Sequence, residues 1–268
     1  MFRADLHMHS AFSDGTLTPQ ELIQKAKMAG VSGISITDHD CVDAYEGLNT
    51  EGFLVGTGVE ISSTFQGGSI HVLAYNFDPS AQEIQAYCQG QKARREERCR
   101  QTLEKLSSMR MPMTLEEVRS VAPQSRVLGR PHIAEAMRRR GYVRSFKEAF
   151  QLYLAEGKPA YFSSSTLSTE EALHLIHRIG GKAFIAHPHL LKPSVLNEIC
   201  LYPFQGIECY YARPAPHDEE RFFQLAKRNK WLVSGGSDFH AEGKGGAIGS
   251  CFVREEAFFA IFPALKVC

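Results

Sequence analysis

The chain opens with ADLHMHSAFSDG, residues 4 to 15, in which apolar and polar side chains alternate. Alternation with a period of two is typical of a β-strand with one apolar and one polar face. His7 and His9 share the polar face, which is unusual for a strand that begins a chain. Thr18 and Glu21 then match a capping box, so the opening predicts a strand, a loop and a helix in succession.

Six further runs have strand character, and helical patterns separate several of them. They span residues 33–37, 53–57, 69–75, 182–186, 206–210 and 231–234. Ser168 and Glu171 form a second capping box, for a helix that ends at Gly180. Seven strands alternating with helices favour an α/β barrel, although a doubly wound sheet satisfies the same pattern. Barrel enzymes place their chemistry at the carboxyl ends of strands.

Helix-compatible, charge-rich sequence replaces the strand pattern between the fourth and fifth strands. We expect a helical insertion over residues 79–157, acting as a substrate cap, and a barrel made of residues 1–78 and 158–268. The insertion carries 15 Lys and Arg against 9 Asp and Glu, although the whole chain has a formal net charge of +0. A basic cap facing an acidic barrel suits an anionic substrate held over bound cations.

Within the insertion, ARREERCR at residues 93–100 has a plainer interpretation. For any single arginine there we expect a solvated helix face with pairs such as Glu96 and Arg100, four residues apart.

The seven cysteines form no CxxC pair, which argues against a disulfide framework and a thiolate zinc site. No apolar run is long enough to span a bilayer, so we expect a cytoplasmic protein without a membrane or obligatory protein partner.

Histidines and acids gather where the expected strands end. Nine potential ligands lie on the first and fourth strands or just after the others: His7, His9, Asp14, His39, Glu60, His71, His187, Asp238 and His240. We place Glu60 just after the third strand. Imidazoles and carboxylates together suit manganese, zinc or iron, and nine ligands are too many for one ion. Two or three ions sharing a carboxylate, as in phosphoester hydrolases, are the economical arrangement.

Six motifs stand in the order found in one enzyme family: DLHMHSAFSDG, ITDHD, GVEIS, GSIHVLAYNF, AHP and SDFH. Together they resemble the PHP (polymerase and histidinol phosphatase) family of metal-dependent phosphoesterases. The resemblance implies a distorted (β/α)7 barrel with a trinuclear centre, manganese being the first choice of metal. It implies three ligand sets: His7, His9, Glu60 and Asp238; Glu60, His71 and His187; and Asp14, His39 and His240. Among these, Glu60, Asp238 and His187 are the expected catalytic residues.

Two motifs of the insertion narrow the resemblance. GRPHIA at residues 129–134 and GKPAY at residues 157–161 resemble bacterial members that hydrolyse 3',5'-bisphosphonucleotides and trim short RNA from the 5' end. Arg130, His132 and Lys158 then become candidate substrate contacts, since arginine makes paired bonds to phosphate oxygens. Alternatives are a histidinol-phosphate phosphatase, a proofreading exonuclease, and a non-catalytic metal-binding protein.

Several other polar residues receive supporting roles or none. Asp5, Asp38 and Asp40 are placed to fix the tautomers of histidine ligands, because such ligands need acceptors behind them. Glu208 could approach the site, but a supporting or structural role is an equally good interpretation. Tyr210 and Tyr211 could stack on a base, although core packing is the role that we expect for them. No role is assigned to His174, His177, His189 and His217.

Overall fold

The computed structural model describes residues 1–163, 167–212 and 216–266, without the side chains of Pro216 and His217. Seven strands form one sheet in the order of the sequence. They are β1 (Ala4–Asp5), β2 (Gly33–Ile36), β3 (Leu54–Phe65), β4 (Gly68–Tyr75), β5 (Lys182–Ile185), β6 (Gly206–Tyr211) and β7 (Leu232–Gly236). Beyond β1, the N–H of His9 donates to the carbonyl of Phe239 at 2.8 Å, beside β7. The sheet therefore nearly closes, which confirms the predicted α/β barrel.

The barrel is distorted at β3 to β5. β3 pairs antiparallel with β4 through the turn at Gln66 and Gly67, and β4 pairs antiparallel with β5. The prediction that the third strand stops near Thr57 was wrong, because pairing with β4 prolongs it to Phe65. Glu60 consequently lies inside β3, not after it.

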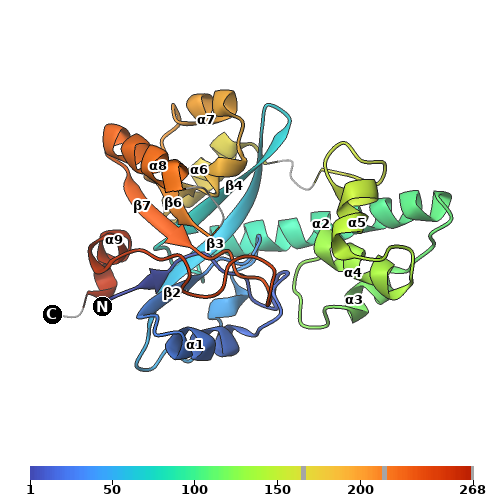
Figure 1. The fold of residues 1–268 in the computed structure, drawn as a ribbon, viewed down its shortest axis with the longest axis horizontal. Coiled ribbons are helices and arrows are strands. Elements are labelled where there is room, and N and C mark those ends of the chain that lie inside the picture. The colour runs from blue at the N-terminus through green and yellow to red at the C-terminus, as the bar shows by residue number, and fades with distance from the viewer. Residues whose placement is uncertain (164–166, 213–215, 267–268) are drawn as a thin grey trace.

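Helices cover the outside of the barrel (Figure 1). They are α1 (Pro19–Met28), α6 (Thr169–Arg178), α7 (Pro193–Ile199), α8 (Pro216–Asn229) and α9 (Glu255–Ile261). Both predicted capping boxes are present: the N–H of Glu21 donates to Thr18 Oγ1, and that of Glu171 to Ser168 Oγ, each at 3.2 Å. In the described residues, no helix combines the length and apolarity needed to cross a bilayer.

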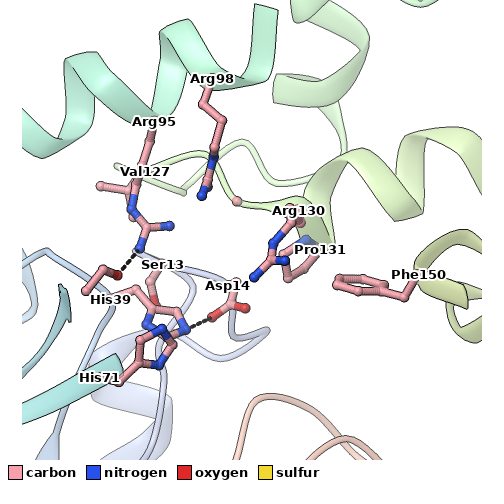
Figure 2. Close-up of a pocket in the computed structure, with 12 residues that line it drawn as sticks. Ser13, Asp14, His39, His71, Arg95, Arg98, Val127, Arg130, Pro131 and Phe150 are labelled. Atoms are coloured by element: carbon pink, nitrogen blue, oxygen red, sulfur yellow. Dashed lines mark hydrogen bonds and ion pairs between the residues drawn. The ribbon is translucent and has the colours of Figure 1, made fainter. Parts of the chain in front are cut away.

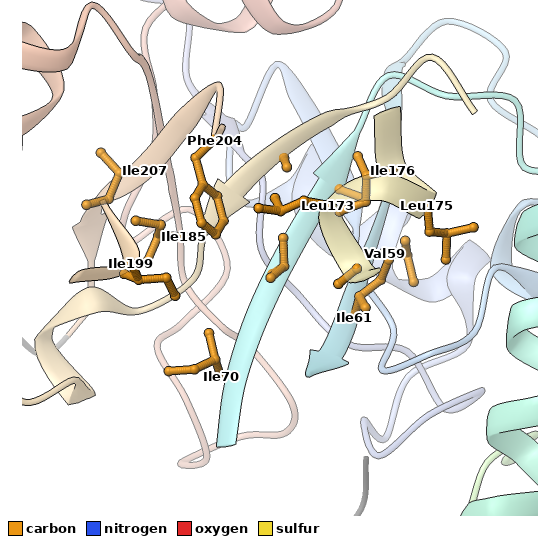
Figure 3. Packing of buried hydrophobic residues seen from close by; sticks show 14 of the residues in the cluster. Val59, Ile61, Ile70, Leu173, Leu175, Ile176, Ile185, Ile199, Phe204 and Ile207 are labelled. Atoms are coloured by element: carbon orange, nitrogen blue, oxygen red, sulfur yellow. The ribbon is translucent and has the colours of Figure 1, made fainter. Parts of the chain in front are cut away.

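The alternation along β4 separates a packing face from a site face. Ile70, Val72 and Ala74 pack outward in the main core, against α6, α7 and α8 (Figure 3). Leu73 and Tyr75 point to the other side, where they pack in a second core with α9. His71 belongs to this inner side, because side chains two residues apart share a face.

The segment between β4 and α6 builds a cap. Its helices are α2 (Gln82–Ser108), α3 (Leu115–Ser120), α4 (Arg130–Arg139) and α5 (Phe146–Ala149), followed by a π-helical turn, Phe150–Leu154. α2 extends away from the strands, and α3 to α5 lie beside its distal half (Figure 1). These helices share a hydrophobic cluster of their own, which includes Leu106, Val118 and Met137. The division of the chain at residues 78/79 and 157/158 remains a prediction.

Candidate metal centre and its basic cap

Four ligand atoms lie close together at the mouth of the barrel. His7 Nε2 lies 3.4 Å from His9 Nε2, 3.3 Å from Glu60 Oε2 and 3.4 Å from Asp238 Oδ1. His9 Nε2 lies 3.2 Å from Glu60 Oε2 and 3.1 Å from Asp238 Oδ1. Ligands bound tetrahedrally at about 2.0 to 2.1 Å from an ion would be about 3.3 to 3.4 Å apart. Each of these five distances therefore matches the spacing of two neighbouring ligands on one first-row ion.

The two carboxylate oxygens of Glu60 face different histidines. Its Oε1 atom lies 2.6 Å from His71 Nδ1 and 2.9 Å from His187 Nε2, while Oε2 faces His7, His9 and, at 3.2 Å, His39 Nδ1. A carboxylate with imidazoles around both oxygens is placed to bridge two cations. Burial alone would raise the pKa of Glu60, but His39, His71 and His7 hold it well below its usual range.

A third group surrounds Asp14. Its Oδ1 atom lies 3.3 Å from His240 Nε2, 3.8 Å from His9 Nδ1 and 4.0 Å from His39 Nε2. His9 and His39 therefore each face two groups. All nine ligands predicted from the sequence meet around these three groups. How the ligands divide among ions remains a prediction.

The donor atoms of the site are of the kind and number that divalent metal ions require. His9 Nδ1, Asp14 Oδ1 and His39 Nδ1 are buried without a hydrogen-bond partner in the described part of the chain. Buried polar atoms left unpaired are costly and rare in folded proteins. Divalent cations would satisfy these atoms, and imidazoles with ionised carboxylates are the donors that first-row ions take.

Glu208 supports two ligands from behind. Its Oε1 atom lies 2.9 Å from His7 Nδ1, and its Oε2 accepts the backbone N–H of His187 at 2.7 Å. His187 has a φ of 28°, a strained backbone conformation for a residue other than glycine. The carboxylate thus orients one imidazole and holds the strained residue, which confirms the supporting role predicted for Glu208.

The tautomer-fixing role predicted for three aspartates was wrong. Asp5 accepts backbone N–H groups of Ser237 and Gly249. Asp38 accepts the hydroxyls of Ser10 and Ser13 and the Ser10 N–H, and Asp40 binds Arg95, Tyr87 and the Ser62 N–H. Adjacency in sequence misled the prediction, because these carboxylates bind backbone N–H groups and side chains that organise the loops around the site.

Three arginines of the cap enclose the open side of the cluster. A cavity of about 110 Å³ is lined by ligands Asp14, His39 and His71 and by Arg95, Arg98 and Arg130. Figure 2 shows the arginines reaching from α2 and α4 toward Asp14 and His39. The cavity therefore joins predicted metal ligands to a concentration of positive charge.

Arg95 and Arg98 contradict the expectation of a solvated helix face. They are only 6% and 7% exposed, whereas Arg100 is on the surface and pairs with Glu96 at 2.7 Å as predicted. Arg95 Nε binds Asp40 Oδ2 at 2.8 Å. Within the described residues Arg98 has neither a hydrogen bond nor an ion pair. Burial, with Arg95 and Arg130 nearby, lowers its pKa to about 9.

The predicted substrate contacts lie in different surroundings. Arg130 lines the cavity, its guanidinium 5.2 Å from the ring centre of Tyr161, and its Nη1 donates to the Leu154 carbonyl at 3.3 Å. His132 is buried and its Nδ1 accepts the N–H of Gly129 at 3.1 Å, a local bond at the start of α4. Lys158 is exposed and outside the cavity lining. Phosphate contact by any of the three stays a prediction.

Two further residues touch the ligands. Tyr211 donates its hydroxyl to Asp238 Oδ2 at 2.6 Å, so the predicted core packing was wrong for Tyr211, whereas Tyr210 does pack against the core. Lys244 Nζ lies 3.5 Å from Asp14 Oδ2 and 5.2 Å from the ring centre of Phe146 in the cap. The only sequence signal for Lys244 was its place four residues after His240, in the glycine-rich run AEGKGG.

Comparison with known proteins gives consistent matches. Residues 5–156 match the family described as PHP domain. The chain is 32% identical to a 3',5'-nucleoside bisphosphate phosphatase of Chromobacterium violaceum, over 92% of this chain and 90% of the relative. It is 35% identical to a 5'-3' exoribonuclease of Haemophilus influenzae, over 88% and 89%.

Solved structures agree with the sequence matches. The structure of a metal-dependent phosphoesterase from Bifidobacterium adolescentis superposes with a TM-score of 0.86 at 29% identity, covering 99% of this chain and 96% of that one. The family match covers more than half of the chain, and the relatives align over nearly their whole length. The chain therefore belongs to the PHP domain family and is a metal-dependent phosphoesterase.

Proposed function

We propose that the protein hydrolyses the 3'-phosphate ester of 5'-phosphorylated nucleotides, either as free 3',5'-bisphosphonucleotides or at the 5' end of short RNA. The names of the two relatives describe these two activities. Both substrates carry a 5'-phosphate one nucleoside away from the phosphate that is attacked. A single arrangement, with the metal centre at one phosphate and a basic pocket at the other, serves both.

The observation that carries this proposal is the buried Arg98, which lies beside Arg95 and Arg130 and has no partner among the described residues. A buried charge without a partner costs several kcal/mol, so a dianion entering this pocket would remove a large penalty. Arginine forks also match phosphate oxygens well. Histidinol phosphate has a single phosphate and cannot engage both the metal centre and the arginines, which disfavours that alternative.

In the reaction, a water oxygen bonds to phosphorus, the bond from phosphorus to O3' breaks, and O3' takes up a proton. In RNA, the next nucleotide keeps the phosphate on its 5' end. Divalent ions supply an activated water and neutralise charge on the phosphate oxygens. Glu60, Asp238 and His187 hold the ions, and the arginines fix the remote phosphate so that the reacting group is positioned.

We assign two to three ions per chain, manganese being the first choice and zinc or iron the alternatives. Metal analysis of the manganese-loaded protein should find two to three equivalents. Saturation at one equivalent, or no bound metal, would contradict the shared role of Glu60.

The substrate assignment is tested by incubating the manganese-loaded protein with adenosine 3',5'-bisphosphate, a 5'-phosphorylated RNA oligomer and histidinol phosphate in separate reactions. We expect release of phosphate from the first and of mononucleotides from the second, with slow turnover of the third. Preferred hydrolysis of histidinol phosphate would replace the nucleotide assignment with the alternative.

A further inference from the structure

Two aromatic rings lie beside ligands of the candidate metal centre that do not line the arginine cavity. His189 lies in the turn Pro188–Leu190 after β5, and Tyr211 ends β6. Their ring centres are 4.3 Å apart with the planes tilted by 43°. Both side chains are half-buried, and the neighbouring Leu190 is 67% exposed. The pair therefore lies at the surface of the site and is not part of the core.

The rings and the arginines border different ligands. Tyr211 binds Asp238, which follows β7, and its ring centre is 6.4 Å from that of His187, which follows β5. The arginine cavity is lined by Asp14 in the loop after β1, by His39 in the segment after β2, and by His71 on β4. A substrate crossing the centre from the arginines would therefore leave it beside His189 and Tyr211.

We propose that His189 and Tyr211 form a stacking site for the nucleobase that follows the scissile phosphate in RNA. This inference rests on the proposed function. With the 5'-phosphate among the arginines and the next phosphate at the metal centre, the second nucleoside must lie on the far side of the cluster. Aromatic side chains hold unpaired bases there without regard to sequence, because every base has a π-face.

The geometry of the pair suits this role. The hydrogen bond to Asp238 fixes the Tyr211 ring, so the site is formed before a substrate arrives and little freedom is lost on binding. In the described part of the chain, Tyr211 is the one aromatic ring in contact with His189. The site would distinguish RNA from a bisphosphonucleotide, which ends at the scissile phosphate and has no second base.

The test compares two substrates in the manganese-loaded protein: adenosine 3',5'-bisphosphate and the 5'-phosphorylated dinucleotide pApA. His189→Ala should lower kcat/KM for pApA by about tenfold and leave the value for the bisphosphate within about twofold. His189→Phe, which keeps a ring, should stay within about threefold of the wild type on both. Leu190→Ala removes an exposed neighbour and is the matched control.

The outcomes separate this inference from the proposed function. If the wild type hydrolyses the bisphosphate but His189→Ala leaves pApA turnover unchanged, the stacking site is refuted and the proposed function stands. Equal losses on both substrates also refute it, because they would show that His189 supports the metal centre. A wild type that hydrolyses neither substrate refutes both.

Discussion

The metal-ligand cluster of the barrel and the arginine face of the cap border one cavity but balance charge differently. In the barrel, imidazoles surround both oxygens of Glu60, and Asp14 faces three histidines. In the cap, Arg95 has Asp40, while Arg98 has no partner among the described residues. The unpaired donor atoms of the barrel favour the binding of cations. The excess positive charge of the cap favours the binding of an anion. The difference indicates a division between chemistry and substrate binding.

The largest loss of activity should follow from substitution of a metal ligand in the barrel. Glu60→Gln should lower kcat/KM by at least about a thousandfold for every substrate, because a neutral amide cannot bridge two cations. Turnover of adenosine 3',5'-bisphosphate and p-nitrophenyl phosphate, with metal content and circular dichroism, checks this. Glu46→Gln, at an exposed acid, is the control. Wild-type turnover by a folded Glu60→Gln protein would remove Glu60 from the centre.

A smaller loss of activity, which depends on the substrate, should follow from substitution of an arginine in the cap. Arg98→Ala and Arg130→Ala each remove a charge-assisted bond of about 1.5 to 3 kcal/mol, so kcat/KM for the bisphosphate should fall by about 10- to 100-fold. p-Nitrophenyl phosphate, which lacks the remote phosphate, should change by less than about threefold. Arg100→Ala, on the exposed face of α2, should leave both values unchanged. Equal losses on both substrates would place the arginines at the scissile phosphate.

The smallest effect should appear at Tyr211. Tyr211→Phe keeps the ring and removes the bond to Asp238 Oδ2, so affinity for manganese should fall by about tenfold. Competition with a chelator measures this, and Tyr210→Phe is the neighbouring control. An unchanged affinity would show that Asp238 is held without Tyr211.

The two regions also differ in how far the sequence predicted them. The nine barrel ligands were found because strand alternation and strand ends mark them, although pairing with β4 moved Glu60 inside β3. Arg95 and Arg98 were missed because burial by the barrel loop that carries Asp40 is a tertiary effect. A partial signal existed: Gln91, Arg95, Arg98 and Thr102 follow a three- to four-residue spacing on α2.

Tyr211 was missed for a different physical reason. In a regular strand, Tyr210 would share the inward face with Glu208, since side chains alternate. The pairing of β6 with β7 shifts register between Glu208 and Tyr210, which turns Tyr211 toward the site instead. An irregularity of this kind depends on the partner strand and leaves no pattern in the sequence of its own strand.

The division between the two regions is tested most directly by removing the remote phosphate from the substrate. With the manganese-loaded wild type, kcat/KM for adenosine 3',5'-bisphosphate should exceed that for adenosine 3'-monophosphate by about 10- to 100-fold or more, because the 5'-phosphate alone engages the arginines. The scissile ester is the same in both compounds. Equal values of kcat/KM would contradict the assignment of the cap as the site that binds the 5'-phosphate.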